Sequence, residues 1–202
     1  MADDYAICLL AGGLARRMGG GDKGEIRYQG KTILAHLCER FSDAPYLFLN
    51  ANGDAGRFAQ YDLPVVSDIL PDHQGPLAGI HAALTHIQAR NQKEATQIEW
   101  LITLPTDAPL LPDHLVKDLR DHRSGHKVVS VQSHGRTHPV IGLWSVAILP
   151  DLEQALCDEG IRKIDLFTKR YDVAYLPYDT RPDPFLNLNR PEDVEALMES
   201  GL

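Results

Sequence analysis

Residues 6–24 of the chain read AICLLAGGLARRMGGGDKG. The first five residues, Ala6 to Leu10, form an uninterrupted apolar run, which is typical of a strand buried on both faces. Glycines follow the run, and their backbone N–H groups can approach an anion closely because glycine has no side chain. Ligands of open α/β sheets bind outside the carboxyl ends of strands, so this stretch predicts a sheet with a ligand-binding loop after its first strand.

The rest of the chain alternates short apolar runs with segments of helical spacing. This rhythm predicts one three-layer α/β domain over residues 1–202, with a mostly parallel central sheet and helices on both faces. Two segments around Gly135 break the rhythm and are expected to pair antiparallel. Strands are expected at 6–10, 46–50, 65–66, 100–104, 127–132, 140–145 and 171–176, and helices at 32–41, 76–89, 112–122, 147–156, 162–169 and 191–198.

Composition and charge argue against several classes of protein. The formal net charge of the 202 residues is -8, whereas a nucleic-acid-binding surface needs clustered lysines and arginines, so no nucleic-acid partner is expected. The three cysteines lie far apart without a CxxC pair, which argues against a zinc site or a disulfide framework. No signal-peptide pattern or membrane-length apolar run is present, so we expect a cytoplasmic protein without a membrane partner.

Three cations accompany the glycines of the loop at residues 11–24: Arg16, Arg17 and Lys23. Backbone donors combined with fixed cations suit a triphosphate, and an ordinary surface turn is the alternative. Residues 19–24 match the dinucleotide pattern GxGxxG literally, but they lie well past the strand and open no evident helix. The loop is therefore read as a phosphate site of another kind.

A second short motif, Gly-Lys-Thr at 30–32, resembles the end of a P-loop. The P-loop requires glycine five residues before its second glycine, and the chain has Glu25 there. Gly30 is instead expected to mark a turn, with Thr32 near the cap of the following helix.

Four parts of the sequence agree with one family pattern. They are Leu-Ala-Gly-Gly at 10–13 with Arg-Arg-Met-Gly at 16–19 and Asp-Lys-Gly at 22–24, Gly-Pro-Leu-Ala-Gly at 75–79, Leu-Pro-Thr-Asp-Ala-Pro at 104–109, and Asn-Leu-Asn-Arg-Pro at 187–191. Together they resemble the molybdenum cofactor guanylyltransferases. The first part is shared with many sugar-phosphate nucleotidyltransferases, but the combination is more specific and covers nearly the whole chain.

The resemblance implies a Rossmann-like nucleotidyltransferase fold that uses GTP as co-substrate and Mg²⁺ as cofactor. It implies transfer of GMP from Mg-GTP to the terminal phosphate of molybdenum-molybdopterin, giving the guanine dinucleotide form of the cofactor and diphosphate. Partners of such an enzyme would include proteins that insert or deliver the cofactor. We expect the chain to be a monomer.

The expected chemistry is attack by a phosphate oxygen of the acceptor on the α-phosphorus of GTP. This nucleophile is already an anion, so catalysis requires positioning and charge neutralisation rather than a strong base. Lys23 and Arg17 are the expected partners of the β- and γ-phosphates. Asp107, in a turn stiffened by Pro105 and Pro109, is the expected Mg²⁺ ligand, with an ordinary turn or helix-cap role as the alternative.

The other expected GTP contacts come from the first loop, a purine-facing loop and two strand ends: Leu10, Ala11, Gly12, Gly13, Gly75, Pro76, Leu77, Gly79, Asn50 and Asp68. Leu10, Ala11 and Gly12 would act mainly through their backbone. Asn50 and Asp68 can read guanine or ribose edges, and a carboxylate facing the N–H donors of guanine would select against adenine. The alternative for both is a turn residue that satisfies its own backbone.

The acceptor is expected near the C-terminus and a hairpin. Asn187 and Asn189 alternate along an extended segment, so both can face the acceptor or the metal shell, and helix capping before Pro191 is the alternative. Arg136 and His138 can contact the pterin or its phosphate, unless they are incidental polar residues of a hairpin.

Two other functions remain open from the sequence. One is a related transferase with another base or acceptor, such as a cytidylyl or sugar-phosphate nucleotidyltransferase, because the choice of guanine rests on the resemblance alone. The other is a non-catalytic nucleotide-binding or cofactor-delivery module, which would keep the loop but lack the metal centre. The presence of Asp107, Lys23 and Arg17 together disfavours this module.

Overall fold

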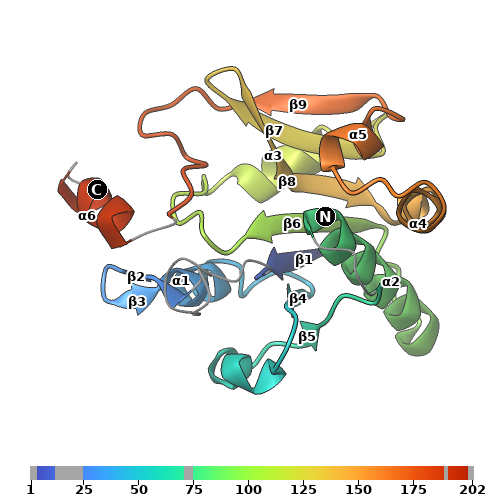
Figure 1. Cartoon of the computed structure of the whole chain (residues 1–202), viewed down its shortest axis with the longest axis horizontal. Coiled ribbons are helices and arrows are strands. Elements are labelled where there is room, and N and C mark those ends of the chain that lie inside the picture. The colour runs from blue at the N-terminus through green and yellow to red at the C-terminus, as the bar shows by residue number, and fades with distance from the viewer. Residues whose placement is uncertain (1–3, 12–24, 71–74, 189–190, 200–202) are drawn as a thin grey trace.

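The computed structural model describes residues 4–11, 25–70, 75–188 and 191–199, which form one seven-stranded sheet, a small separate hairpin and covering helices (Figure 1). The sheet contains β1 (Tyr5–Leu10), β4 (Leu47–Asn50), β5 (Val65–Val66), β6 (Trp100–Pro105), β7 (Val128–Ser133), β8 (Arg136–Ser145) and β9 (Val173–Pro177), and the hairpin contains β2 (Arg27–Tyr28) and β3 (Lys31–Thr32). The helices are α1 (Ile33–Arg40), α2 (Pro76–Glu94), α3 (Leu115–Asp121), α4 (Leu149–Cys157), α5 (Ile164–Thr168) and α6 (Pro191–Glu199), with 3-10 helices η2 (Ala55–Tyr61) and η3 (Val146–Ile148).

The strand order of the large sheet is β5-β4-β1-β6-β8-β7-β9. Neighbouring strands are parallel except where β8 is involved, and β8 runs antiparallel to both β6 and β7. The expected mostly parallel sheet and the antiparallel pair around Gly135 are therefore confirmed.

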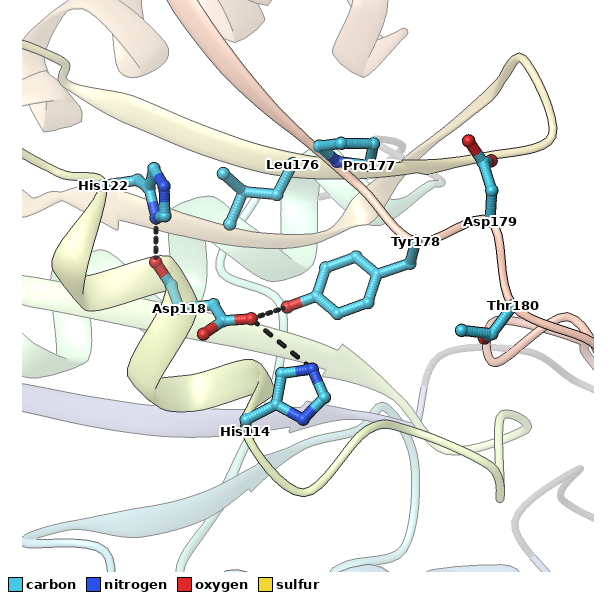
Figure 2. A pocket seen from close by; sticks show the side chains of 8 residues that line it. All are labelled: His114, Asp118, His122, Leu176, Pro177, Tyr178, Asp179 and Thr180. Atoms are coloured by element: carbon cyan, nitrogen blue, oxygen red, sulfur yellow. Dashed lines mark hydrogen bonds and ion pairs between the residues drawn. The ribbon is translucent and has the colours of Figure 1, made fainter.

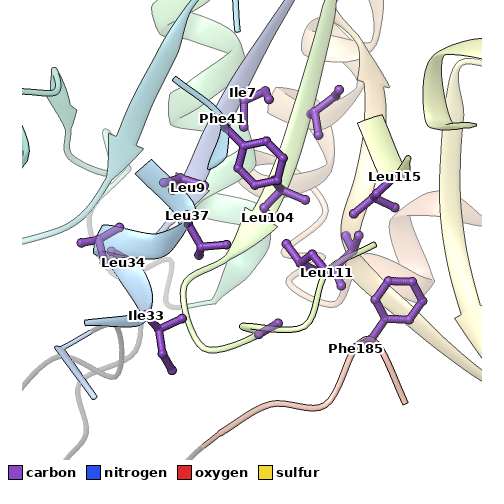
Figure 3. Packing of buried hydrophobic residues seen from close by; sticks show 14 of the residues in the cluster. Ile7, Leu9, Ile33, Leu34, Leu37, Phe41, Leu104, Leu111, Leu115 and Phe185 are labelled. Carbon is purple, nitrogen blue, oxygen red and sulfur yellow. The ribbon is translucent and has the colours of Figure 1, made fainter. Parts of the chain in front are cut away.

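Helices cover both faces of the sheet, as the burial of β1 on both of its faces requires. Ile7 and Leu9 pack into a cluster with residues of α1, α3 and α6, part of which is shown in Figure 3. Ala6, Cys8 and Leu10 point the other way and pack with α2, α4 and α5. Each face buries a large apolar area, and this burial is the main stabilising contribution in a domain of this size.

The direction in which the chain winds reverses at β1. From β1 the chain passes through α1 to β4 and then to β5, on one side of β1. Helix α2 then carries it back to β6, on the other side of β1. In open α/β sheets, a crevice for ligands opens at the carboxyl ends of the strands where the order reverses. The fold thus places its ligand edge at the ends of β1 and β6.

Several local predictions can be compared with the structure. Thr32 caps α1, because its Oγ1 accepts a hydrogen bond from the Ala35 N–H at 3.0 Å, and Gly30 has a positive φ of 85° in the preceding turn. The expected helix at 112–122 begins only at Leu115, since Pro112 closes a turn in which its carbonyl accepts from the Leu115 N–H. None of the described helices is both long and apolar enough to span a membrane.

Candidate active site at the carboxyl edge of the sheet

Four strand ends lie level along one edge of the sheet. Leu10 of β1 is in register with Asn50 of β4 on one side and with Pro105 of β6 on the other, and Asn50 is in register with Val66 of β5. The Ala11 N–H donates to the Asn50 carbonyl at 2.9 Å, which continues the pairing one residue past the strands. Residues that follow these ends are therefore brought together from distant parts of the sequence.

The turn after β6 carries Asp107, which is only 8% exposed. The preceding Thr106 donates through its hydroxyl to the Leu10 carbonyl at 3.4 Å, so the turn is tied to the end of β1. The Asp107 carbonyl accepts a 2.7 Å hydrogen bond from the Leu188 N–H. A carboxylate-bearing turn thus lies between the first strand end and the C-terminal segment, which we define as residues 178–188.

Asn50 and Asp68 form a hydrogen-bonded unit at the ends of β4 and β5. The buried Asn50 amide donates to the Val66 carbonyl and to Asp68 Oδ1, both at 3.0 Å. Asn52 donates to Asp68 Oδ2 at 2.8 Å, and the Asp68 N–H donates to Asn52 Oδ1 at 2.9 Å. The Asn50 side chain therefore holds Asp68, and the Asp68 carboxylate, the charged group of this unit, keeps lone pairs for a ligand.

Gly75 begins α2 in a conformation that favours glycine. Its φ is 131° and its ψ is 170°, a region of backbone space essentially restricted to glycine. Pro76 is the first helical residue, as expected, and none of the described side chains caps this end of the 19-residue helix. Backbone N–H groups of the first helical turn and the positive end of the helix dipole favour negative charge there.

Gly79 lets α2 pass close over the strand ends. A Cβ atom on Gly79 would lie 2.4 Å from Asn50 Oδ1 and 3.2 Å from Leu10 Cδ2, so even an alanine would collide with the Asn50 side chain and crowd that of Leu10. Leu77 points into the core and is 1% exposed, which leaves its backbone as the part that could meet a nucleotide. The structure thus brings the segment at 75–79 against Leu10 and Asn50.

The hairpin between β7 and β8 lies at the same edge, because β8 starts where the parallel strands end. Arg136 is exposed there. His138 bonds through Nε2 to the Ser133 hydroxyl at 2.7 Å and packs on Phe185, with ring centroids 4.9 Å apart. Burial lowers the pKa of His138, assisted by the charge of Arg136 and opposed by that of Asp183. His138 therefore supports the C-terminal segment in the described structure.

A pocket of about 330 Å³ lies between α3 and the end of β9 (Figure 2). Asp118 Oδ2 accepts from the Tyr178 hydroxyl at 2.6 Å and lies 3.6 Å from His114 Nε2. The Tyr178 ring stacks on His114 and meets Phe185 edge-on, and burial raises the pKa of Tyr178. These polar groups contact one another and thereby link α3 to the C-terminal segment. We therefore do not take this pocket as the candidate site.

Comparisons with known proteins identify the family of the chain. Residues 7–173 match the model of the MobA-like NTP transferase domain. Proteins named molybdenum cofactor guanylyltransferase are similar to the chain: one from Rhodopseudomonas palustris (strain HaA2) is 44% identical over 96% of this chain and 92% of its own, and one from Nitrobacter hamburgensis is 46% identical over 92% and 89%. The chain belongs to the molybdenum cofactor guanylyltransferase family. It is accordingly a nucleotidyltransferase, and the expected resemblance is confirmed.

A solved structure shares the fold of this family member. The molybdopterin-guanine dinucleotide biosynthesis protein A from Archaeoglobus fulgidus superposes with a TM-score of 0.77 at 23% identity, covering 98% of this chain and all of the other. The likeness confirms the expected α/β nucleotidyltransferase fold. Membership of a transferase family also sets aside the non-catalytic delivery module considered from the sequence.

Several residues predicted for the guanylyltransferase site lie outside the described residues. They are Gly12, Gly13, Arg17 and Lys23 of the first loop and Asn189 near the C-terminus. Ala11 and Glu25 are described on either side of the loop, and Ala11 is bonded to the end of β4. The roles of the five residues stay predictions.

The described residues contain no group of three or more histidine, cysteine, aspartate or glutamate side chains that could hold a metal. A single buried carboxylate such as Asp107 nevertheless suits Mg²⁺, which usually takes one or two protein carboxylates and completes its shell with substrate phosphates and water. The donor set of this family member therefore fits a metal that arrives with a nucleotide.

Two residues of the edge were not assigned from the sequence. Asn52 bonds both Asp68 Oδ2 and the Asp68 N–H, and Thr106 ties the Asp107 turn to β1. The alternation of Asn50 and Asn52 was a usable signal, since residues two apart can face the same side of an extended segment. The Thr106 bond depends on the pairing of β1 with β6, which the sequence did not specify.

Proposed function

We propose that the protein transfers GMP from Mg-GTP to the terminal phosphate of molybdopterin carrying molybdenum. An oxygen of the acceptor phosphate forms a new bond to the α-phosphorus of GTP, the bond between the α-phosphorus and the bridging oxygen breaks, and diphosphate leaves. The names of the relatives support these substrates. We further propose that the enzyme acts as a monomer in the cytoplasm.

The position of Asp107 carries the proposal. Its turn lies at the point where the strand order reverses and is tied through Thr106 to the strand that precedes the glycine loop. A Mg²⁺ ion held by this carboxylate would offset the negative charge of the phosphates. The first loop, with Lys23 and Arg17, would contact the β- and γ-phosphates, and the start of α2 adds favourable electrostatics at the same edge.

The two halves of the edge suit two different substrates. Asn50, Asp68 and the segment at 75–79 lie on the β4–β5 side of β1, where we place the nucleoside of GTP. Arg136, His138 and the C-terminal segment with Asn187 lie beyond β6, where we place the acceptor. The reacting phosphates would then meet between these halves, beside Asp107.

A nucleotide panel tests the function. The purified protein is incubated with Mg²⁺, molybdenum-loaded molybdopterin and one of GTP, CTP, ATP or UTP, and both diphosphate and the dinucleotide product are measured. We expect product with GTP and little with the others. Preferential use of CTP, or of a sugar 1-phosphate as acceptor, would support one of the alternative transferases instead.

The Asp107→Ala variant tests the metal role. We expect at least a hundredfold lower turnover, in line with the loss of a group that offsets charge in the transition state, together with an unchanged circular dichroism spectrum. The Asp113→Ala variant is the matched control, because Asp113 follows in the same connection and its exposed side chain pairs with Arg40 at the surface. Turnover that survives in Asp107→Ala would remove this residue from the mechanism.

A further inference from the structure

Asn52 holds the Asp68 carboxylate from two directions. Its Nδ2 donates to Asp68 Oδ2 at 2.8 Å, and its Oδ1 accepts from the Asp68 backbone N–H at 2.9 Å. Asn50 Nδ2 holds the other carboxylate oxygen at 3.0 Å. Both carboxylate oxygens are therefore fixed by amides from one strand end, and rotation of the carboxylate plane is blocked.

The backbone of Asn52 is anchored in turn. The Arg57 guanidinium donates to the Asn52 carbonyl at 2.8 Å and lies over the Phe58 ring, 4.7 Å from its centroid. Phe58 is buried in the core, so η2 provides a rigid support for this loop. Asn52 itself is exposed, which means that the bond to Asp68 is made at the surface of the ligand edge.

Such a carboxylate suits a ligand edge with two adjacent N–H donors. The amides that hold Asp68 are neutral, so they orient the carboxylate without neutralising its charge. Each oxygen keeps a lone pair beyond the one used by an amide. Guanine presents N1–H and N2–H₂ side by side, whereas adenine presents an acceptor at N1, which a carboxylate repels.

We propose that Asn52 is a positioning residue that sets the specificity for guanine by fixing the plane of the Asp68 carboxylate against the N1–H and N2–H₂ groups. This inference rests on the proposed function, since it takes GTP as the nucleotide. Because Asn52 acts through Asp68 and lies away from the reacting phosphates, its loss should change KM and base preference rather than kcat.

The Asn52→Asp variant isolates this role. The new side chain has the same shape and can still accept from the Asp68 N–H, but it loses the donor to Oδ2 and sets a like charge against the carboxylate. We expect KM for GTP to rise about tenfold with kcat nearly unchanged. The preference for GTP over ITP, which lacks the 2-amino group, should fall by a similar factor, both in turnover and in equilibrium binding without acceptor.

Two further variants keep the test decisive. Asn52→Ala removes the donor without adding charge and should also lower the GTP-to-ITP preference. Ser67→Ala is the control, because the Ser67 hydroxyl bonds the Ala51 carbonyl in the same pair of loops and does not bond Asp68 in the described structure. We expect Ser67→Ala to keep the wild-type preference.

The outcomes separate the inference from the function on which it rests. An unchanged GTP-to-ITP preference in both Asn52 variants overturns the inference. An equal fall of this preference in Ser67→Ala also overturns it, because the fall would then come from loosening of the loops. Wild-type protein that binds GTP in preference to ITP but forms no dinucleotide product contradicts the proposed function alone.

Discussion

At the scale of single residues, the ligand edge depends on close approach at Gly79. Replacing a glycine by alanine inside a helix normally stabilises it by about 1 kcal/mol. Here the added Cβ would lie 2.4 Å from Asn50 Oδ1, and overpacking of this kind costs about 1–3 kcal/mol. We therefore predict that Gly79→Ala lowers the free energy of unfolding in denaturant titrations.

A double variant checks the cause of this loss. Asn50→Ala removes the colliding atom, so Gly79→Ala should cost less in the Asn50→Ala background than alone. If Gly79→Ala lowers the free energy of unfolding equally in both backgrounds, the collision with Asn50 does not cause the loss of stability.

The sequence identified residues of the site better than it identified their partners. Asn50, Asp68 and Asp107 were predicted from their places after apolar runs, and the structure places all three at one edge. Their roles toward GTP and metal stay predictions. The hydrogen bonds of Asn52 and Thr106 could not be predicted, because they depend on which strands are neighbours and in which register.

At the scale of elements, the C-terminal segment is held by an aromatic contact. Phe185 is 2% exposed and lies between His138 and Tyr178. We predict that Phe185→Ala lowers the free energy of unfolding by about 3–5 kcal/mol, the usual cost of deleting a buried phenylalanine. The neighbouring Leu186→Ala, at a position 41% exposed, should change it little. Similar losses in both variants would contradict this account.

Long elements with clear periodicity were predicted well, and so was the two-residue strand β5, but other short elements were missed. Strands β1, β4 and β6 and helix α2 match the expected positions to within a few residues. The hairpin of β2 and β3 and the helix η2 were not expected, since Arg27–Tyr28 and Lys31–Thr32 are not apolar runs and a 3-10 helix carries no periodic apolar pattern. The strand predicted at 140–145 begins at Arg136, because pairing with β7 resumes beyond an irregularity near Gln132.

At the scale of the whole molecule, two half-buried histidines link stability to pH. Burial lowers the pKa of His86, assisted by Arg90 and opposed by Glu94, and burial likewise lowers the pKa of His138. The unfolded chain therefore binds more protons than the folded chain as pH falls below about 6.5. The stability that these histidines contribute is present above that pH and is lost as pH falls through their folded pKa values.

Thermal unfolding at two pH values measures this linkage. We predict that the Tm of the wild type falls between about pH 7.5 and about pH 5.5, and that it falls less in the His86→Gln, His138→Gln double variant. The exposed His122→Gln variant is the control and should follow the wild type. An identical fall in the double variant would show that other groups determine the acid response.

The reversed strand β8 has a consequence for how this family can diversify. Since β8 begins at the edge where the parallel strands end, the turn between β7 and β8 is a surface loop that can gain or lose residues without shifting β1, β4 or β5. If the acceptor binds beyond β6 as proposed, evolution can therefore alter which molecule receives the nucleotide while leaving the donor half of the enzyme intact.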